Sequence, residues 1–143
     1  MEICGSLYRP KPSIVFPVFK SPYSIIGNFL GEDVGPSRET CKFYLSWLAR
    51  GENLLRPKVL EGNGNTVVLS GCWTAIFSKH DISVDMVVPT SALLEIIEYW
   101  ERVLDAVRRN DIADELLTFH LRVEGGDMLP DIERFRKLIT EQT

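Results

Sequence analysis

Hydrophobic residues recur every third or fourth position between residues 90 and 109, and this is the clearest pattern in the chain. Such spacing puts apolar side chains on one stripe of an α-helix, so it predicts an amphipathic helix over this range. The stripe consists of Leu93, Ile96, Ile97, Trp100, Val103, Leu104 and Val107. Thr90 is expected to be its N-cap, and Glu98 is expected to pair with Arg102 one turn later.

Two further segments have helical patterns. Residues 37–51 begin with Ser37, a good N-cap, and end with Gly51, which is expected to stop the helix at its C′ position. The same run also alternates at every second residue, as a strand does, but the capping residues at both ends favour the helix. The segment 129–142 predicts a short amphipathic helix with Pro130 near its first position.

Alternation and runs of β-branched and aromatic residues predict strands elsewhere. The expected strands are 1–8, 13–19, 58–62, 66–70, 72–78, 82–88 and 117–124. Pro17 favours an edge position for the second of these, because proline cannot donate to a sheet ladder. Residues 21–36 are rich in turn formers and are expected to form a loop with one helical turn.

The Gly-x-Gly at Gly62 and Gly64 raises the question of a phosphate-binding loop. A phosphate loop opens onto a helix N-terminus, whose free N–H groups hold the anion. Here the glycines precede the strand-like run "TVVLSGCWTAIF" at 66–77, and the lysine and hydroxyl of a P-loop are missing. The glycines therefore predict the turn of a β-hairpin.

The order of these elements predicts an α+β fold with a mostly antiparallel β-sheet and helices packed on one face. No repeat, linker or low-complexity stretch divides the chain, so residues 1–143 are expected to form a single domain. In the strand 82–88, one set of alternate residues is expected to face the core. The other set is expected to lie on a solvated face of the sheet and comprises Asp81, Ser83, Asp85 and Val87.

Composition narrows the classes of partner. The net charge is −4 with a pI of about 5.2, and no basic stripe is present, which argues against nucleic acid and permits a basic protein partner. The three cysteines are far apart and form no CxxC, as expected in a reducing compartment. Glu2 stands where a signal peptide would have positive charge, and no apolar run is long enough to span a membrane. These features predict a cytoplasmic protein without a membrane segment.

Recognised catalytic patterns do not occur in the sequence. His80 and His120 are the only histidines, and neither has a metal-ligand spacing to another histidine or cysteine. There is no GxSxG nucleophile motif, and the acidic pairs are of a kind common on any acidic surface. We therefore expect no catalytic residue, no metal and no cofactor. A small acidic domain of this kind more often works by binding another protein than as an enzyme.

Residues 37–107 resemble the small immunity proteins encoded beside bacterial polymorphic toxins, including contact-dependent growth inhibition systems. The resemblance rests on a helix ending at "ARGE", a Gly-Asn turn, hairpin strands, and a strand leading through a Thr/Ser cap into "LLEIIEYWERVL". It implies tight binding to a cognate toxin domain in the cytoplasm of the producing cell, and many toxins of this kind are nucleases with basic active sites. No site residue is carried over by the resemblance.

The expected partner-binding surface is the solvated face of the sheet together with an acidic loop. Its residues are Glu32, Asp33, Asp81, Asp85, His120, Arg122 and Glu124. An alternative is a small enzyme or ligand-binding domain with a pocket near the loop 21–36, which carries aromatic and acidic residues. A third is an adaptor that dimerises through the open face of its sheet.

Overall fold

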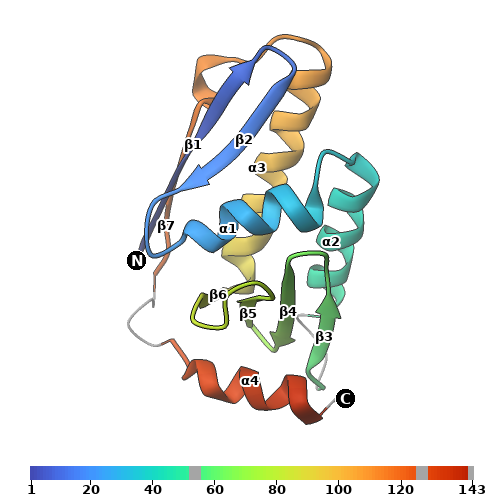
Figure 1. Cartoon of the computed structure of the whole chain (residues 1–143), viewed down its shortest axis with the longest axis vertical. Coiled ribbons are helices and arrows are strands. Elements are labelled where there is room, and N and C mark those ends of the chain that lie inside the picture. The colour runs from blue at the N-terminus through green and yellow to red at the C-terminus, as the bar shows by residue number, and fades with distance from the viewer. Residues whose placement is uncertain (52–55, 125–128, 142–143) are drawn as a thin grey trace.

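The computed structural model describes residues 1–51, 56–124 and 129–141 (Figure 1). Within these residues the chain forms two antiparallel sheets and four α-helices, with a π-helix after the first helix and a 3₁₀ turn before the last strand. The α+β class and the antiparallel pairing predicted from the sequence are confirmed. The strands are divided between two sheets, which the sequence did not indicate.

The first sheet has three strands in the order β2-β1-β7, all antiparallel. The strands are β1 (Glu2–Lys11), β2 (Ile14–Phe19) and β7 (Thr118–Arg122). β1 and β2 form a hairpin in which Tyr8 lies opposite Phe16, and β7 pairs with the other side of β1. β2 is an edge strand, as Pro17 predicted.

The second sheet has four strands in the order β3-β4-β5-β6, each antiparallel to its neighbour. The strands are β3 (Lys58–Glu61), β4 (Asn65–Ser70), β5 (Trp73–Ser78) and β6 (Asp85–Pro89). Gly62 and Gly64 lie in the β3–β4 turn, which the Gly62 N–H closes by donating to the Asn65 carbonyl over 2.9 Å. The hairpin reading of Gly-x-Gly is confirmed.

Helical segments account for most of the remaining chain. They are α1 (Ser24–Asn28), the π-helix η1 (Phe29–Val34), α2 (Arg38–Gly51), α3 (Thr90–Arg108), the 3₁₀ turn η2 (Asp114–Leu116) and α4 (Ile132–Glu141). The three predicted helices are found in their predicted places, although α4 begins at Ile132, two residues after Pro130, and residue 142 lies outside the described residues. The segment 21–36 is largely helical, so its prediction as a loop with one helical turn was wrong.

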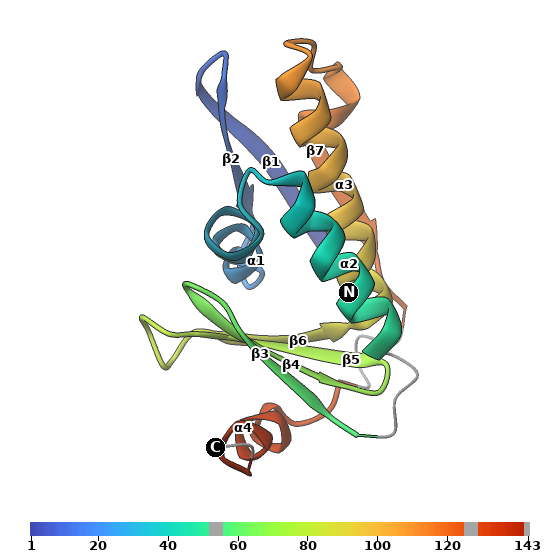
Figure 2. The ribbon, with the colours of Figure 1, turned by 90° about the vertical axis from the view of Figure 1, so that its right-hand side faces the viewer.

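The four-stranded sheet is covered on both faces (Figure 2). On one face, Val67, Leu69, Ile76, Met86 and Val88 join the main core with α1, α2 and α3. On the other face, Val68, Ala75, Phe77 and Val87 pack against Phe135 of α4. Helices therefore contact both faces of this sheet, where one covered face was expected. The expected solvated face of β6 lies beneath α4, because α4 supplies the second apolar layer.

Several predicted ends differ in detail. Ser37 accepts a hydrogen bond from the Thr40 N–H, as an N-cap does. Gly51 is the last residue of α2 and lacks the left-handed backbone of a C′ glycine. A Cβ at this position would collide with the Leu69 side chain of β4, so close packing of α2 on the sheet requires the glycine. Thr90 is the first residue of α3 rather than its N-cap. Ile82 is 85% exposed in the turn before β6, so the predicted strand begins three residues too early.

Candidate functional site

Asp33 is buried and serves the fold. The π-helix η1 turns its carboxylate toward the β3–β4 turn, where Oδ1 accepts the Gly64 N–H over 2.7 Å and Oδ2 accepts the Asn65 side-chain amide over 2.8 Å. Gly62 makes room for this contact, since a Cβ there would lie 2.6 Å from Asp33 Cγ. Asp33 was expected to be exposed to a partner, and this was wrong because Asp33 is buried. The turn that it binds lies 31 residues further along the chain.

Glu32 lies in the π-helix η1 and Asp81 lies in the turn before β6, and both residues are exposed. Glu32 Oε2 is 3.7 Å from His80 Nε2, and both side chains are about half exposed or more. Asp81 Oδ1 accepts hydrogen bonds from the Ser83 N–H (3.0 Å) and the Ser83 hydroxyl (2.6 Å). These hydrogen bonds lower the pKa of Asp81 because they stabilise its charged form. Asp81 therefore fixes the turn before β6, and its carboxylate remains open to solvent.

Asp85 belongs to the covered face of the four-stranded sheet. Its Oδ2 accepts a hydrogen bond from Arg136 Nη2 of α4 over 2.6 Å. The same guanidinium lies over the ring of Phe77, 5.0 Å from its centroid. The expectation of a solvated Asp85 is wrong, because α4 binds this face through Phe135 and through the ion pair.

His120, Arg122 and Glu124 lie on or just after β7, in the other sheet. His120 Nε2 is 3.7 Å from Glu2 Oε2, and all three side chains are exposed. The predicted residues therefore do not form one face: β6 and β7 belong to different sheets. A role for these three residues in binding a partner stays a prediction.

A group of acidic side chains that the prediction missed lies on α3, beside β7. Glu95, Glu98, Glu101 and Arg102 line a hollow of about 520 Å³ with Phe119 of β7. A second hollow of about 260 Å³ extends from Glu95 along the C-terminal end of β7. It is lined by Pro89, Ser91, Ala92, Glu95, Leu121, Arg122, Val123 and Glu124. We call the two hollows together the acidic trough.

The carboxylates of the acidic trough stand out because none of them is paired within the part of the chain that the structure describes. Glu95, Glu98, Glu101 and Glu124 form no ion pair with any described residue, although Arg102 and Arg122 lie in the same trough. The predicted pairing of Glu98 with Arg102 is therefore absent. One oxygen of Glu101, Oε2, is buried without a hydrogen-bond partner. The only sequence signal was three glutamates at i, i+3 and i+6 on the polar side of the helix stripe.

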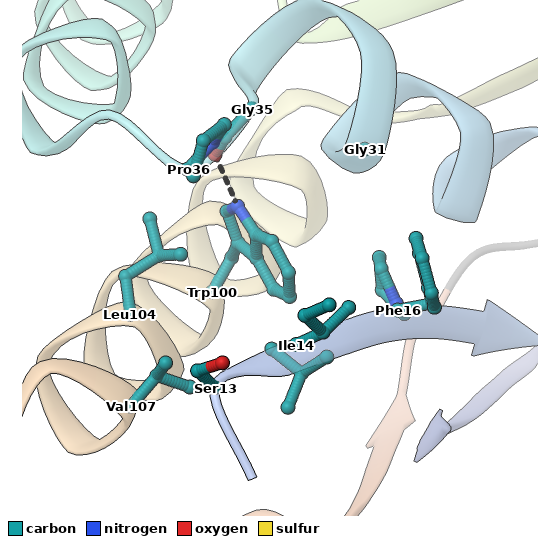
Figure 3. A pocket seen from close by; sticks show the side chains of 11 residues that line it. Ser13, Ile14, Phe16, Gly31, Gly35, Pro36, Trp100, Leu104 and Val107 are labelled. Atoms are coloured by element: carbon teal, nitrogen blue, oxygen red, sulfur yellow. Dashed lines mark hydrogen bonds between the residues drawn. The ribbon is translucent and has the colours of Figure 1, made fainter. Parts of the chain in front are cut away.

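An apolar groove lies on the opposite side of α3 (Figure 3). It has a volume of about 300 Å³ and runs between β2, the end of η1, and the last turns of α3. Its lining residues are Ser13, Ile14, Val15, Phe16, Pro17, Gly31, Gly35, Pro36, Trp100, Leu104 and Val107. Ser13 carries the one side-chain hydroxyl, and none of the lining side chains titrates. The groove therefore offers apolar contact area.

Trp100 is central to the apolar groove. Its indole N–H donates to the Gly35 carbonyl over 2.9 Å, so its polar atom is satisfied and its ring is left for apolar contact (Figure 3). A Cβ added at Gly31 or Gly35 would meet no atom within 4 Å, so this part of the groove is open. Phe16, one of the lining residues, is 50% exposed and stacks on Tyr8 with 6.3 Å between ring centroids.

No protein-family model matches the chain, and no curated protein or solved structure is significantly similar to it. In residues 1–51, 56–124 and 129–141, no three histidine, cysteine or carboxylate side chains gather as metal ligands would. Over the same residues, no helix is both long enough and apolar enough to cross a bilayer.

Proposed function

We propose that the protein binds and neutralises a cognate secreted toxin domain, the function implied by the resemblance of residues 37–107 to immunity proteins. One observation carries the proposal: the carboxylates of the acidic trough are gathered on one surface and form no ion pair within residues 1–51, 56–124 and 129–141. Four carboxylates face two guanidinium groups there. This surface is suited to a basic protein.

Unpaired like charges at neighbouring helix positions bring a small cost in stability, so the fold itself gains nothing from them. A surface of one sign speeds the encounter with a partner of opposite sign and fixes its orientation. The neutralising step is then steric: the bound protein covers or distorts the active surface of the toxin domain. A basic nuclease domain is the partner class that this charge favours.

The test is calorimetric titration with the C-terminal domain of the large secreted protein encoded directly upstream. We expect one-to-one binding with a nanomolar Kd. The variant Glu95→Lys/Glu98→Lys should weaken binding at least about tenfold, because each reversal replaces attraction by repulsion, and the loss should shrink at high salt. The unfolding free energy should change by less than about 0.5 kcal/mol, since both side chains are exposed.

A matched control is Glu61→Lys/Glu141→Lys, which makes the same change in net charge on exposed residues of β3 and α4. This variant should bind like the natural sequence. Absence of binding by the natural sequence would contradict the proposed function. Equal weakening by both charge reversals would show that net charge alone matters and that the acidic trough is not the contact.

A second candidate function is the binding of a small apolar ligand, which the apolar groove favours because it opens beside the segment 21–36. The probe is the dye 1-anilinonaphthalene-8-sulfonate, whose fluorescence rises in apolar sites. Gly31→Leu should abolish the rise by filling open space, since Gly31 has no positive φ and no close neighbour. Toxin binding unaffected by Gly31→Leu would separate the two functions.

A further inference from the structure

The two edges of the three-stranded sheet are treated differently by the fold. The edge of β2 is protected: Gly27 of α1 comes so close that a Cβ there would lie 2.7 Å from the Pro17 carbonyl oxygen. Pro17 itself has no N–H to offer to another strand. A covering helix and an edge proline are both ways in which proteins prevent unwanted strand pairing.

No described residue protects the edge of β7 in this way. The Leu7 N–H donates to the Leu117 carbonyl and the Val123 N–H donates to the Met1 carbonyl, so odd-numbered residues of this strand face β1. Backbone groups of successive strand residues point to opposite sides. The N–H and C=O groups of Thr118, His120 and Arg122 therefore point away from the sheet. No backbone hydrogen bond from these groups to another element occurs among the described residues.

The acidic trough lies beside this open edge. Phe119 of β7 borders one of its hollows, Leu121 to Glu124 border the other, and Glu95 of α3 belongs to both. A strand added to β7 would therefore run along the trough. Every second side chain of that strand would point toward the exposed surface of α3, where Glu95 and Glu98 form no ion pair with any residue that the structure describes.

We propose that β7 accepts an extended, basic segment of the partner as a fourth strand of the sheet. The inference rests on the proposed function and specifies the contact. Each outward residue of β7 offers one donor and one acceptor, which give main-chain affinity. Alternate lysine or arginine residues, about 7 Å apart on the added strand, reach the carboxylates of Glu95 and Glu98. Arg102 at the far end of the trough disfavours a basic residue there.

A second copy of this chain is a poorer occupant. Pairing through β7 of both copies would bring two acidic troughs together, and like charges oppose that contact. The protected edge of β2 cannot be the complementary strand, because α1 covers its second half. The charge of the trough therefore selects a basic strand from another protein.

The test uses two probes that need no toxin domain: acetylated and amidated octapeptides of alternating lysine and valine, or of alternating glutamate and valine. In the free protein the amides of Thr118, His120 and Arg122 should exchange quickly with deuterium, and those of Phe119 and Leu121 slowly. Millimolar lysine peptide should slow the three outward amides at least about tenfold, and the glutamate peptide should not. Equal effects of both peptides, or no effect, would overturn the proposal.

Two variants at His120 separate main-chain pairing from side-chain contact. His120→Pro removes the outward N–H and leaves the ladder with β1 intact, as proline at an outer edge allows. His120→Thr removes the imidazole and keeps the N–H. The proline variant should lose the protection at Thr118 and Arg122, and the threonine variant should keep it. Retained protection in a folded proline variant would overturn the proposal, and Arg122→Pro repeats the test if that variant does not fold.

The outcomes also separate this inference from the proposed function. If the toxin domain binds but leaves the three outward amides unprotected, the contact is elsewhere and strand addition is overturned. If the lysine peptide protects them and the upstream domain does not bind, the neutralising function fails while strand addition stands. Protection that grows with protein concentration alone would indicate pairing between two copies and would also overturn the proposal.

Discussion

Asp33 and Glu98 are both acidic residues on helical segments, yet the fold uses only one of them. Asp33 accepts two hydrogen bonds that hold the turn of the four-stranded sheet, and Asp85 of that sheet is paired with Arg136. Glu98, on the side of the three-stranded sheet, has no partner among the described residues. The difference shows that position, more than charge, decides whether a carboxylate stabilises the protein or remains for a partner.

The two sheets also differ in how much of their surface the helices cover. The four-stranded sheet has apolar layers on both faces, whereas the three-stranded sheet keeps exposed Tyr8, Phe16 and Val18 on its outer face. The register places Tyr8 opposite Phe16, and Val18 follows Phe16 by two residues on β2, so the three side chains share one face. One sheet is therefore a closed core element, and the other presents an open face and one open edge.

The largest effect on stability is expected when the four-stranded sheet loses its second apolar layer. Phe135→Ala removes the aromatic ring through which α4 packs on Phe77 and Val87, and the ring is 2% exposed. We expect a loss of about 3–5 kcal/mol in the free energy of unfolding, measured by urea titration. Phe43→Ala is the control, because Phe43 is 48% exposed on α2 and should cost less than about 1 kcal/mol.

An equal loss in the two phenylalanine variants would mean that α4 is not part of the cooperative core. The four-stranded sheet would then be as open as the three-stranded sheet, and the contrast between them would disappear. Dye binding gives a second readout, since the uncovered Phe77 and Val87 should raise the fluorescence of an apolar dye only in Phe135→Ala.

A smaller loss of stability is expected when the buried carboxylate of Asp33 is removed. Asp33→Ala leaves the Gly64 N–H and the Asn65 amide without their acceptor in a buried turn, and we expect a loss of about 2 kcal/mol. Its neighbour provides the control: Glu32→Ala removes an exposed carboxylate near His80 and should cost less than about 1 kcal/mol. A cost for Glu32→Ala as large as that for Asp33→Ala would contradict the structural role assigned to Asp33.

Local patterns were sufficient to predict much of this fold. The helix stripe from Leu93 to Val107 and the hairpin at Gly62 depend on residues close together in the chain, and both are found where expected. The division into two sheets could not be predicted in this way. It depends on β7 pairing with β1, where Ile3 meets Leu121, and alternation within a strand does not specify a partner so distant in sequence.

The candidate site was harder to predict for the same reason. Asp33 and Asp85 look solvated in the sequence, but segments far along the chain cover them. Glu98 looked paired because Arg102 stands four residues later, although an exposed pair of this kind gains too little to be formed reliably. Acidic residues at the surface could be counted from the sequence, but their internal partners required the fold.

The smallest expected effect on stability involves Glu101, the member of the acidic trough with a buried carboxylate oxygen. Burial, and then the charge of Glu101, raise the pKa of the Cys41 thiol from 9.0 to about 11. The unfolded chain releases this proton near pH 9 and the folded chain does so only near pH 11. Stability from the neutral thiol is therefore complete below pH 9 and is lost as the pH rises toward 11.

We expect the contribution of Cys41 to lower the unfolding free energy by about 1 kcal/mol between pH 8 and pH 10, as measured by urea titration at each pH. Glu101→Gln should make this loss smaller, because it removes the negative charge that opposes ionisation of Cys41. Glu98→Gln is the matched control and should leave the alkaline loss unchanged. An identical loss in Glu101→Gln and in the natural sequence would mean that the charge of Glu101 does not reach the thiol. A smaller loss would show that the carboxylate of Glu101 lowers the stability of the folded protein at alkaline pH. Such a cost is expected of a charge that serves a partner and not the fold.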